Sequence, residues 1–351
     1  MQIELPISKS IANRWLMLQA IHGDELMPVS DSMPNDVRIM SEAIRLLGER
    51  REARIDLGNC GTAMRFLTAY CAQLEGQTTI LDGVERMHHR PIGQLVDALR
   101  EIGADIEYLG EDGFPPLRIK GCTLDKHRIV TINNPLSTQY ISALLLIGAN
   151  VITNSTSPYI NLTHSLIENY LQRSDLQGID ARSTASVANE LERDWSSAAF
   201  WYEYVALYGG EITLPNLFRD SLQGDKVVAD IFAHLGVSTQ YTEEGIRIYR
   251  SQAILNSKFL IQNFSACPDL YPAVALTCER LGIELHATGV ESLPLKESDR
   301  LRAVREHRTD HDHRMAMALL VAGYEVEDTA CISKSYPQFI EQWNSVNTSN
   351  E

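Results

Sequence analysis

The sequence Gly58-Asn59-Cys60-Gly61-Thr62-Ala63-Met64-Arg65 combines small residues with the start of a helical run. It follows Ile55-Asp56-Leu57, which is typical of a strand end, and it opens residues 63–72, which contain neither proline nor glycine. Small residues allow a ligand to approach the backbone closely, and the free N–H groups of a helix start attract anions. Arg65, one turn into the helix, can add a two-pronged contact to a phosphate or carboxylate. Taken alone, the stretch is equally compatible with an ordinary strand–turn–helix junction.

The composition is that of a folded, acidic protein. The length of 351 residues suits about two domains, and 44% hydrophobic with 22% charged residues excludes a disordered chain. A net charge of −15 argues against nucleic acid or a membrane surface as a partner, because both are polyanionic. The sequence has no apolar run of about 18 residues and residues 1–6 do not resemble a signal peptide, so we expect a cytoplasmic protein.

The six cysteines are scattered along the chain. They form no Cys-x-x-Cys pair, and no histidine cluster has the spacing of metal ligands. We therefore expect reduced thiols and no bound metal.

The arrangement of the opening stretch, a turn that leads into a helix, recurs along the chain. Hydroxyl, acidic or basic residues stand at similar turn-to-helix junctions at Ser10, Thr62, Thr138, Ser197, Asp269 and Arg314. The intervals are 52, 76, 59, 72 and 45 residues, which is too long and irregular for the common solenoid repeats. This pattern predicts an α/β (α+β) chain of six repeated units, divided as three and three into two domains.

Several elements can be placed from the pattern. Helices are predicted at 11–22, 37–47 and 92–102, and an extended segment at 182–187. Residues 3–8 are predicted to form a short strand. Residues 103–108 should begin a β-hairpin whose second strand includes 117–119. A domain boundary is expected near 190–195, where a charged stretch meets an apolar helix.

Two groups of residues suggest acid–base chemistry. Lys296-Glu297-Ser298-Asp299-Arg300 is either a solvated helix start or a set of groups that control each other's ionisation. Asp269 lies between Pro268 and Pro272 at the start of an apolar helix. It could cap that helix or act as a rigidly held base.

The arginines suggest gathered anion sites. Each alone could be a surface residue, but five occupy turn-to-helix junctions, and the guanidinium fork matches phosphate and carboxylate. They are Arg14, Arg65, Arg90, Arg300 and Arg314, with Lys9 and Lys334 placed similarly beside serines. No glycine-rich dinucleotide or nucleotide loop and no serine-hydrolase motif is present. The ligands should therefore carry at least two phosphate or carboxylate groups.

The order of these motifs resembles that of the 5-enolpyruvylshikimate-3-phosphate synthase family over residues 3–343. The motifs are Ser8-Lys9-Ser10 with Arg14, Gly58–Arg65, Arg90-Pro91-Ile92, Ser137-Thr138-Gln139, Asp194 with Ser196-Ser197, Pro268-Asp269, Lys296–Arg300, Asp312-His313-Arg314 and Lys334. The resemblance implies two domains of three βαβαββ-type units each. It places residues 9–192 in one domain and residues 1–8 with 193–351 in the other, with an active site in the interdomain cleft.

The resemblance also implies an activity. The enolpyruvyl group of phosphoenolpyruvate would move to the 5-hydroxyl of shikimate-3-phosphate by addition and elimination, and phosphate would leave. This is a transferase step of the shikimate pathway towards chorismate and the aromatic amino acids. It implies no organic cofactor and no metal, two small-molecule substrates and a monomeric enzyme.

Individual roles follow from the same resemblance. Asp269 is implied to be the base on the 5-hydroxyl, and Lys9 and Glu297 to handle the proton near phosphoenolpyruvate. Phosphoenolpyruvate is implied to contact Lys9, Gly61, Arg90, Gln139, Arg300, Arg314 and Lys334. Shikimate-3-phosphate is implied to contact Ser10, Arg14, Ser137, Thr138, Gln139, Ser157, Asp269 and Lys296.

The chain departs from the family pattern in several places. Cys60 and Phe66 replace the usual alanine and proline, Thr138 replaces a serine, and Ser292 stands where an asparagine often occurs. Only 13 residues separate Arg300 from Arg314, where the family usually has a few tens more. Either the last unit is trimmed or a loop is missing from the sequence, and the charged run 305–310 favours a missing loop. Segments 47–55 and 172–189 also look short. Gly61, rather than alanine, predicts sensitivity to glyphosate.

Two other functions remain as alternatives. The enolpyruvyl transferase that acts on UDP-N-acetylglucosamine shares the fold, but Lys296–Arg300 and Ser137-Thr138-Gln139 fit the shikimate enzyme better. A non-catalytic anion-binding relative would not need the combination of Lys9, Asp269 and Glu297.

Overall fold

The computed structural model describes residues 1–175, 191–251 and 258–348, and the chain forms two compact units. The C-terminal unit consists of Met1–Lys9, Asp31–Asn35 and Leu191–Glu351, and the N-terminal unit of Ser10–Ser30 and Asp36–Glu190. Residues 9, 31–35 and 191–192 belong to the C-terminal unit, whereas the predicted division places them in the other domain. The second of these segments joins the C-terminal unit because Asn35 donates to Ser333 (2.8 Å) and Gln338 donates to the Ser32 carbonyl (2.6 Å).

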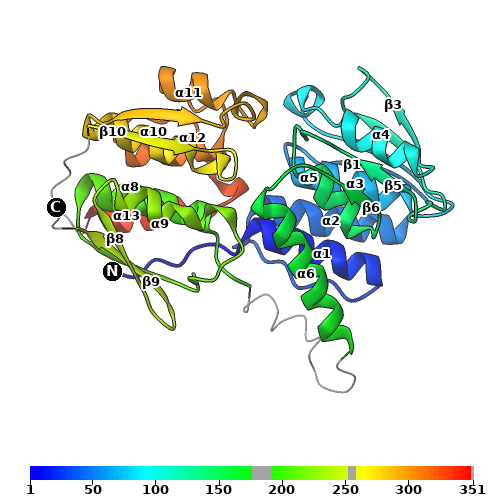
Figure 1. Cartoon of the computed structure of the whole chain (residues 1–351), viewed down its shortest axis with the longest axis horizontal. Helices are drawn as coiled ribbons and strands as arrows, with labels where there is room; N and C mark the ends of the chain where they lie inside the picture. Colours follow the sequence, from blue (N-terminus) through cyan, green and yellow to red (C-terminus); the bar gives the residue numbers. More distant parts are fainter. Residues whose placement is uncertain (176–190, 252–257, 349–351) are drawn as a thin grey trace. The chain divides into compact units, whose positions relative to one another are not determined.

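The N-terminal unit contains a four-stranded sheet in the order β1-β2-β4-β3 (Figure 1). Strand β2 is parallel to β1 and antiparallel to β4, and β4 pairs antiparallel with β3 through partners such as Ile106 and Ile119. The predicted hairpin is therefore confirmed. The strands are β1 (Glu52–Asp56), β2 (Thr78–Asp82), β3 (Asp105–Tyr108) and β4 (Leu117–Lys120).

Helices and a second, parallel strand pair complete this unit. Helix α3 packs against α5, and α5 packs against α6. The helices are α1 (Lys9–His22), α2 (Asn35–Glu49), α3 (Gly61–Ala72), η1 (Glu85–His89), α4 (Gly93–Glu101), α5 (Gln139–Leu146) and α6 (Pro158–Asp175), and the strand pair is β5 (Ile129–Thr131) with β6 (Asn150–Ile152). The helices predicted at 11–22, 37–47 and 92–102 are confirmed as α1, α2 and α4.

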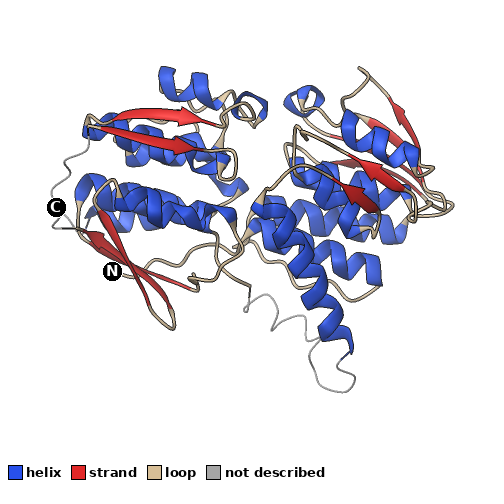
Figure 2. Cartoon of the chain, viewed as in Figure 1, coloured by secondary structure: helices blue, strands red, loops and turns tan. Residues whose placement is uncertain are grey.

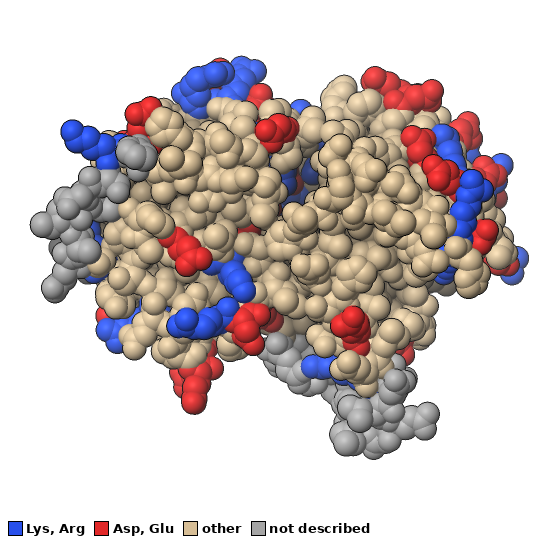
Figure 3. Space-filling view, viewed as in Figure 1, with Lys and Arg blue, Asp and Glu red and all other residues tan. Residues whose placement is uncertain are grey.

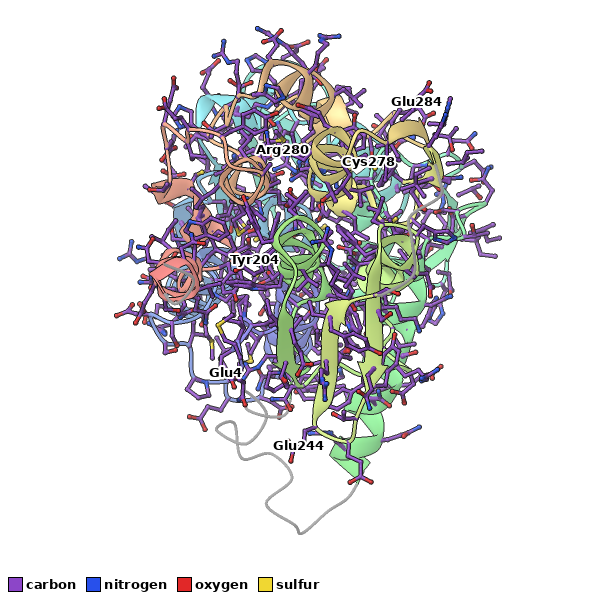
Figure 4. The ribbon with its side chains drawn as sticks, turned by 90° about the vertical axis from the view of Figure 1, so that its left-hand side faces the viewer. Glu4, Tyr204, Glu244, Cys278, Arg280 and Glu284 are labelled. Atoms are coloured by element: carbon purple, nitrogen blue, oxygen red, sulfur yellow. The ribbon has the colours of Figure 1, made fainter. Side chains whose placement is uncertain are left out.

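The core of the C-terminal unit surrounds α8 (Trp195–Tyr208). Residues Trp195 to Ala206 are buried on every side of this helix, as expected for a helix enclosed by other elements. It packs against α9 (Val228–Ala233), α10 (Tyr271–Leu281) and α12 (His313–Val321). Figure 4 shows α8 nearly end-on at Tyr204, with α10 marked by Cys278 and Arg280.

Two sheets flank these helices (Figure 2). One is antiparallel in the order β7-β9-β8, and the other is the parallel pair β10-β11, with α10 packed against β11. The strands are β7 (Glu211–Pro215), β8 (Val237–Tyr241), β9 (Gly245–Arg250), β10 (Phe259–Asn263) and β11 (Glu284–Thr288). The shorter helices are η2 (Gly224–Val227), η3 (Pro268–Leu270), η4 (Leu293–Leu295), α11 (Arg300–Glu306), η5 (Ala330–Lys334) and α13 (Phe339–Thr348). The α/β class predicted from the sequence is confirmed.

The last repeat is closed by a tight turn instead of a hairpin. The order β10-α10-β11-α11 parallels β1-α3-β2-α4, but only residues 307–312 separate α11 from α12, where the N-terminal unit has β3 and β4 after α4. Three non-glycine residues of this turn have positive φ: His307 (52°), Asp310 (44°) and His311 (58°). This conformation is unfavourable for side-chain-bearing residues, so neighbouring contacts must hold it. The His307 ring stacks on Tyr324 and approaches the Glu279 carboxylate at 2.9 Å.

The strand predicted at 3–8 is not a strand. Only single bridges form there, between Gln2 and Thr213 and between Ile7 and Arg193. Pro6 has no N–H to donate, although its carbonyl accepts from the Asp194 N–H (3.0 Å). The extended segment predicted at 182–187 lies outside the described residues. No helix among the described residues is long and apolar enough to cross a bilayer.

Glu203 on α8 should make stability depend on pH. Its side chain is fully buried, neither carboxyl oxygen has a hydrogen-bond partner among the described residues, and burial holds its pKa well above the usual range. Because the folded protein keeps this proton after the unfolded chain has lost it, the group costs stability as pH rises above about 4.3. We expect Glu203→Leu to raise the free energy of unfolding by about 1–3 kcal/mol at neutral pH, and by less in acid.

Urea unfolding at several pH values measures this effect. The control is Glu244→Leu at the exposed β8–β9 turn (Figure 4), which should leave the pH dependence unchanged. An unchanged pH dependence in Glu203→Leu would contradict the assignment.

Candidate active site

A buried arginine organises the charged side chains of the C-terminal unit. The side chain of Arg300 is 1% exposed and its three nitrogens each meet a carboxylate. Nε donates to Asp312 (2.8 Å), Nη1 to Asp269 (2.7 Å) and Nη2 to Glu297 (3.1 Å). Burial alone would lower the pKa of Arg300, but these carboxylates outweigh burial and raise it. The other arginines of α11 are exposed, and Lys and Arg gather over this helix in Figure 3.

Asp269 receives contacts from three cations. Its Oδ1 lies 2.7 Å from Arg300 Nη1 and 3.3 Å from Lys296 Nζ, and its Oδ2 lies 3.0 Å from Arg314 Nη2. Burial would raise the pKa of Asp269, but Arg314, Lys296, Arg300 and Lys9 together hold it well below the usual range. Helix α10 has no side-chain cap, so the capping alternative for Asp269 is wrong. Asp269 is an ionised carboxylate with about a quarter of its surface exposed.

The N-terminus of α12 holds the next part of the cluster. The fully buried Asp312 caps α12 by accepting from the Arg314 N–H (2.9 Å), and it also accepts from Ser298 (3.1 Å). His313 is buried too, and burial followed by the charges of Lys9 and Arg314 lowers its pKa well below the usual range. His313 is therefore neutral. Asp312 thus joins the helix cap to the arginine network.

The structure brings the predicted residues of this unit together. Lys334 Nζ lies 3.9 Å from Glu297 Oε1, and Lys9 interacts electrostatically with Asp269 and His313. The cluster therefore includes Lys9, Asp269, Lys296, Glu297, Arg300, Arg314 and Lys334. Such a group can bind anions and also offers carboxylates and an ammonium group for proton transfer.

The opening stretch and Arg90 meet in the N-terminal unit. A Cβ added to Gly61 would lie 2.6 Å from both Nη atoms of Arg90, so the guanidinium lies directly over the glycine. Gln139 at the start of α5 donates to the Thr62 hydroxyl (2.8 Å). Tyr140, next to it, donates to the Pro91 carbonyl (2.5 Å). Gly61, Arg90 and Gln139 therefore lie together, at the N-terminal ends of α3 and α5.

Arg65 differs from the sequence-based expectation. Its Nη1 donates to the Gly61 carbonyl (3.2 Å) and its Nη2 to the Pro91 carbonyl (2.9 Å), and the side chain is buried. Arg65 braces the two backbone segments that carry Gly61 and Arg90. Spacing along a helix shows which residues share a face, but it does not reveal which distant carbonyl a buried arginine will contact.

A second group lies at the starts of α1, α5 and α6. Arg14 donates to the Ser10 carbonyl (2.8 Å), to Thr163 (2.8 Å) and to Ser142 (2.9 Å), which uses three of its five N–H donors. Burial lowers the pKa of Arg14 to about 10, so it stays charged at neutral pH. The predicted hydroxyl residues precede the helices that Arg14 joins: Ser137 and Thr138 before α5, and Ser157 before α6.

One buried acid beside this chemistry has no sequence signal. Asp225 is 1% exposed; one oxygen contacts Ser196 Oγ and the other has no hydrogen-bond partner among the described residues. Burial, then the charge of Asp269, raises its pKa to about 7. Sequence reasoning missed Asp225 because it lies in the short helix η2 and carries no recognisable motif. Asp312, in contrast, was visible as an acid just before an apolar helix.

Comparison with known proteins gives the family. The model for EPSP synthase (3-phosphoshikimate 1-carboxyvinyltransferase) matches residues 1–307 and 304–343. A 3-phosphoshikimate 1-carboxyvinyltransferase of Bacteroides fragilis is 37% identical, covering 96% of this chain and 93% of the relative. The chain belongs to the EPSP synthase family. A Bordetella bronchiseptica relative with the same name is 30% identical over 97% of this chain and 94% of its own length.

EPSP synthase structures share the fold. One from Acinetobacter baumannii aligns with a TM-score of 0.69 and 20% identity, over 98% of this chain and 95% of its own. The Bacteroides alignment spans 390 positions, more than the 351 residues of this chain, so it contains gaps here. The two segments matched by the family model meet at 304–307, at the end of α11 and the start of the tight turn. This turn lies in the stretch that the sequence analysis described as short.

The double role of Asp312 predicts an unusually large loss of stability on truncation. Asp312→Ala removes both a helix cap and a carboxylate that compensates the buried Arg300, so we expect a loss of about 3–5 kcal/mol in the free energy of unfolding. Asp299 is the control because it caps α11 by accepting from the Arg302 N–H (3.2 Å) and, within the part of the chain that the structure describes, forms no ion pair with a buried charge. Asp299→Ala should cost about 1 kcal/mol. Equal losses in urea unfolding would contradict the network.

Proposed function

We propose that this chain is an active 3-phosphoshikimate 1-carboxyvinyltransferase, which transfers the enolpyruvyl group of phosphoenolpyruvate to the 5-hydroxyl of shikimate-3-phosphate and releases phosphate. The observation that carries the proposal is Asp269, an ionised carboxylate held among Lys296, Arg300 and Arg314. Family membership supplies the reaction, and this cluster supplies charged groups suited to it. The proposed setting is the shikimate pathway in the cytoplasm, with a monomeric enzyme.

In the addition step, Asp269 accepts the proton of the 5-hydroxyl while the oxygen of that hydroxyl bonds to C2 of phosphoenolpyruvate. The methylene carbon receives a proton from Lys9 or Glu297 and becomes a methyl group. In the elimination step, a methyl proton returns to the group that donated it, the C2–O bond to phosphate breaks, and the double bond forms again. The departing phosphate takes the proton that Asp269 accepted, so both protein groups are regenerated. Preorganised charges stabilise the anions and position the two substrates without any change in their redox state.

The anionic groups of the substrates require many cations. We propose that Arg90 and the backbone at Gly61 bind phosphoenolpyruvate with Gln139, and that Lys9, Arg300, Arg314 and Lys334 complete its contacts. Shikimate-3-phosphate is assigned to Ser10, Arg14, Ser137, Thr138, Gln139, Ser157, Asp269 and Lys296. The guanidinium of Arg14 is largely engaged by Ser10, Ser142 and Thr163, so its proposed contribution to a phosphate comes from its remaining donors and its charge. Both units supply residues to this proposal, so neither unit should catalyse the reaction alone.

Asp269→Asn tests the proposed base. The substitution keeps the shape of the side chain but removes the proton acceptor, so we expect kcat to fall by about 100- to 10,000-fold. Phosphate release from phosphoenolpyruvate, measured with shikimate-3-phosphate and EDTA, gives the rate. Binding of phosphoenolpyruvate, followed by calorimetric titration, should be largely retained and shows that the variant is folded. Wild-type turnover in Asp269→Asn would remove this residue from the mechanism.

Gly61→Ala tests the proposed phosphoenolpyruvate site. The new Cβ would lie 2.6 Å from the Arg90 guanidinium, so Arg90 has to shift. We expect a higher KM for phosphoenolpyruvate and a higher glyphosate concentration for half-inhibition. Gly48→Ala is the control, because its Cβ would meet nothing within 4 Å. If both variants keep the wild-type KM and inhibition, Gly61 and Arg90 do not form this site.

A further inference from the structure

Gln223 joins two distant parts of the chain with all of its side-chain hydrogen-bonding groups. It is 4% exposed, and its Oε1 accepts from Ser8 Oγ (2.9 Å) and from the Trp195 N–H (3.3 Å). Its Nε2 donates to the Arg193 carbonyl (2.7 Å) and to Glu192 Oε2 (2.8 Å). These four bonds satisfy both lone pairs and both N–H groups of the amide.

Glu192 extends this contact into a network. Its Oε2 also accepts from Ser221 (2.7 Å), and its Oε1 accepts from the Trp195 indole (2.9 Å) and the Phe218 N–H (3.4 Å). A carboxylate with this many donors is held in one position, and it in turn orients the Gln223 amide. We call Gln223 and Glu192 together the clasp.

The clasp lies where the chain leaves and re-enters the C-terminal unit. That unit includes residues 1–9 and continues from Leu191. Next to the clasp, the Ser8 N–H donates to the Glu192 carbonyl (2.9 Å), and Ile7 forms a bridge with Arg193. The clasp therefore fixes the backbone of residues 6–8 against residues 192–194, and Lys9 follows directly.

We propose that Gln223 is a positioning residue for the reaction, which acts by fixing the backbone that carries Lys9 beside the Asp269 cluster. The inference rests on the proposed function. Lys9 interacts electrostatically with Asp269 and His313, and a lysine side chain is long and flexible, so its placement depends on the backbone from which it starts. Small displacements of a catalytic group cost large factors in rate.

Gln223→Ala is the first test. We expect kcat/KM for phosphoenolpyruvate to fall by about 10- to 100-fold. Binding of shikimate-3-phosphate should change far less, because Arg14 is held separately by Ser142 and Thr163. The matched control is Gln19→Ala: Gln19 is also 4% exposed, and it also bridges a loop, through the Glu25 carbonyl (2.8 Å) and the Met27 N–H (3.0 Å). It should lose comparable stability while keeping kcat/KM.

Gln223→Glu provides a readout that a merely structural role would not give. The described charged group that contacts position 223 is the Glu192 carboxylate; Ser8 contributes a hydroxyl, and Arg193 and Trp195 contribute backbone groups. An ionised glutamate there cannot donate and repels Glu192, whereas a protonated one can donate again. We expect kcat/KM of Gln223→Glu, relative to wild type, to recover as pH is lowered from about 8 to about 5.5. Gln223→Ala should show no such recovery.

The possible outcomes separate the two proposals. If the wild-type chain releases no phosphate from its substrates, the proposed function fails, and this inference fails with it. If the wild type is active and both Gln223 variants keep its kcat/KM, only the inference is overturned. The inference would also be overturned if Gln19→Ala, with a comparable loss of stability, lost as much kcat/KM as Gln223→Ala.

Discussion

The structure depends most on the buried charge of Arg300. A buried guanidinium needs acceptors for its N–H groups, and at Arg300 these are three carboxylates: Asp312, Asp269 and Glu297 each accept from one of its nitrogens. These partners come from three places in the C-terminal unit: the start of α12, η3 before α10, and the segment before α11. One requirement for charge balance therefore fixes Asp269, Glu297 and Arg300 relative to one another within the C-terminal unit. Arg314 and Lys296, together with Arg300, keep Asp269 ionised by lowering its pKa.

The contact between Arg300 and Asp312 also spans the short connection in the last repeat. In the N-terminal unit α4 leads into a hairpin, whereas α11 leads through a tight turn into α12. The turn contains three residues with positive φ, and contacts of His307 with Tyr324 and Glu279 hold it. Arg300 and Asp312, on either side of the turn, still form their contact at 2.8 Å. The two segments matched by the family model meet at this turn, and the charged cluster forms across it.

Several helices, the hairpin and part of the charged cluster could be predicted from the sequence, because their signals lie in short stretches of the chain. Helix periodicity located α1, α2 and α4, and the spacing of apolar residues around 103–119 located the hairpin. Lys296–Arg300 and Asp269 were recognisable by charge and by flanking prolines. The carbonyl partners of Arg65 could not be predicted, because tertiary packing determines which distant backbone groups it contacts. Gln223 and Asp225 gave no signal, since their roles arise from contacts with residues far away in the sequence, such as Ser8 and Ser196.

The most direct test of the central claim is phosphate release by the unmodified chain with EDTA present. Phosphoenolpyruvate would be supplied alone, with shikimate-3-phosphate, and with UDP-N-acetylglucosamine. The account predicts release only with shikimate-3-phosphate. Release that required UDP-N-acetylglucosamine would assign the chain to the other enolpyruvyl transferase reaction. Binding of phosphoenolpyruvate and shikimate-3-phosphate without any release would contradict the claim and indicate an anion-binding protein.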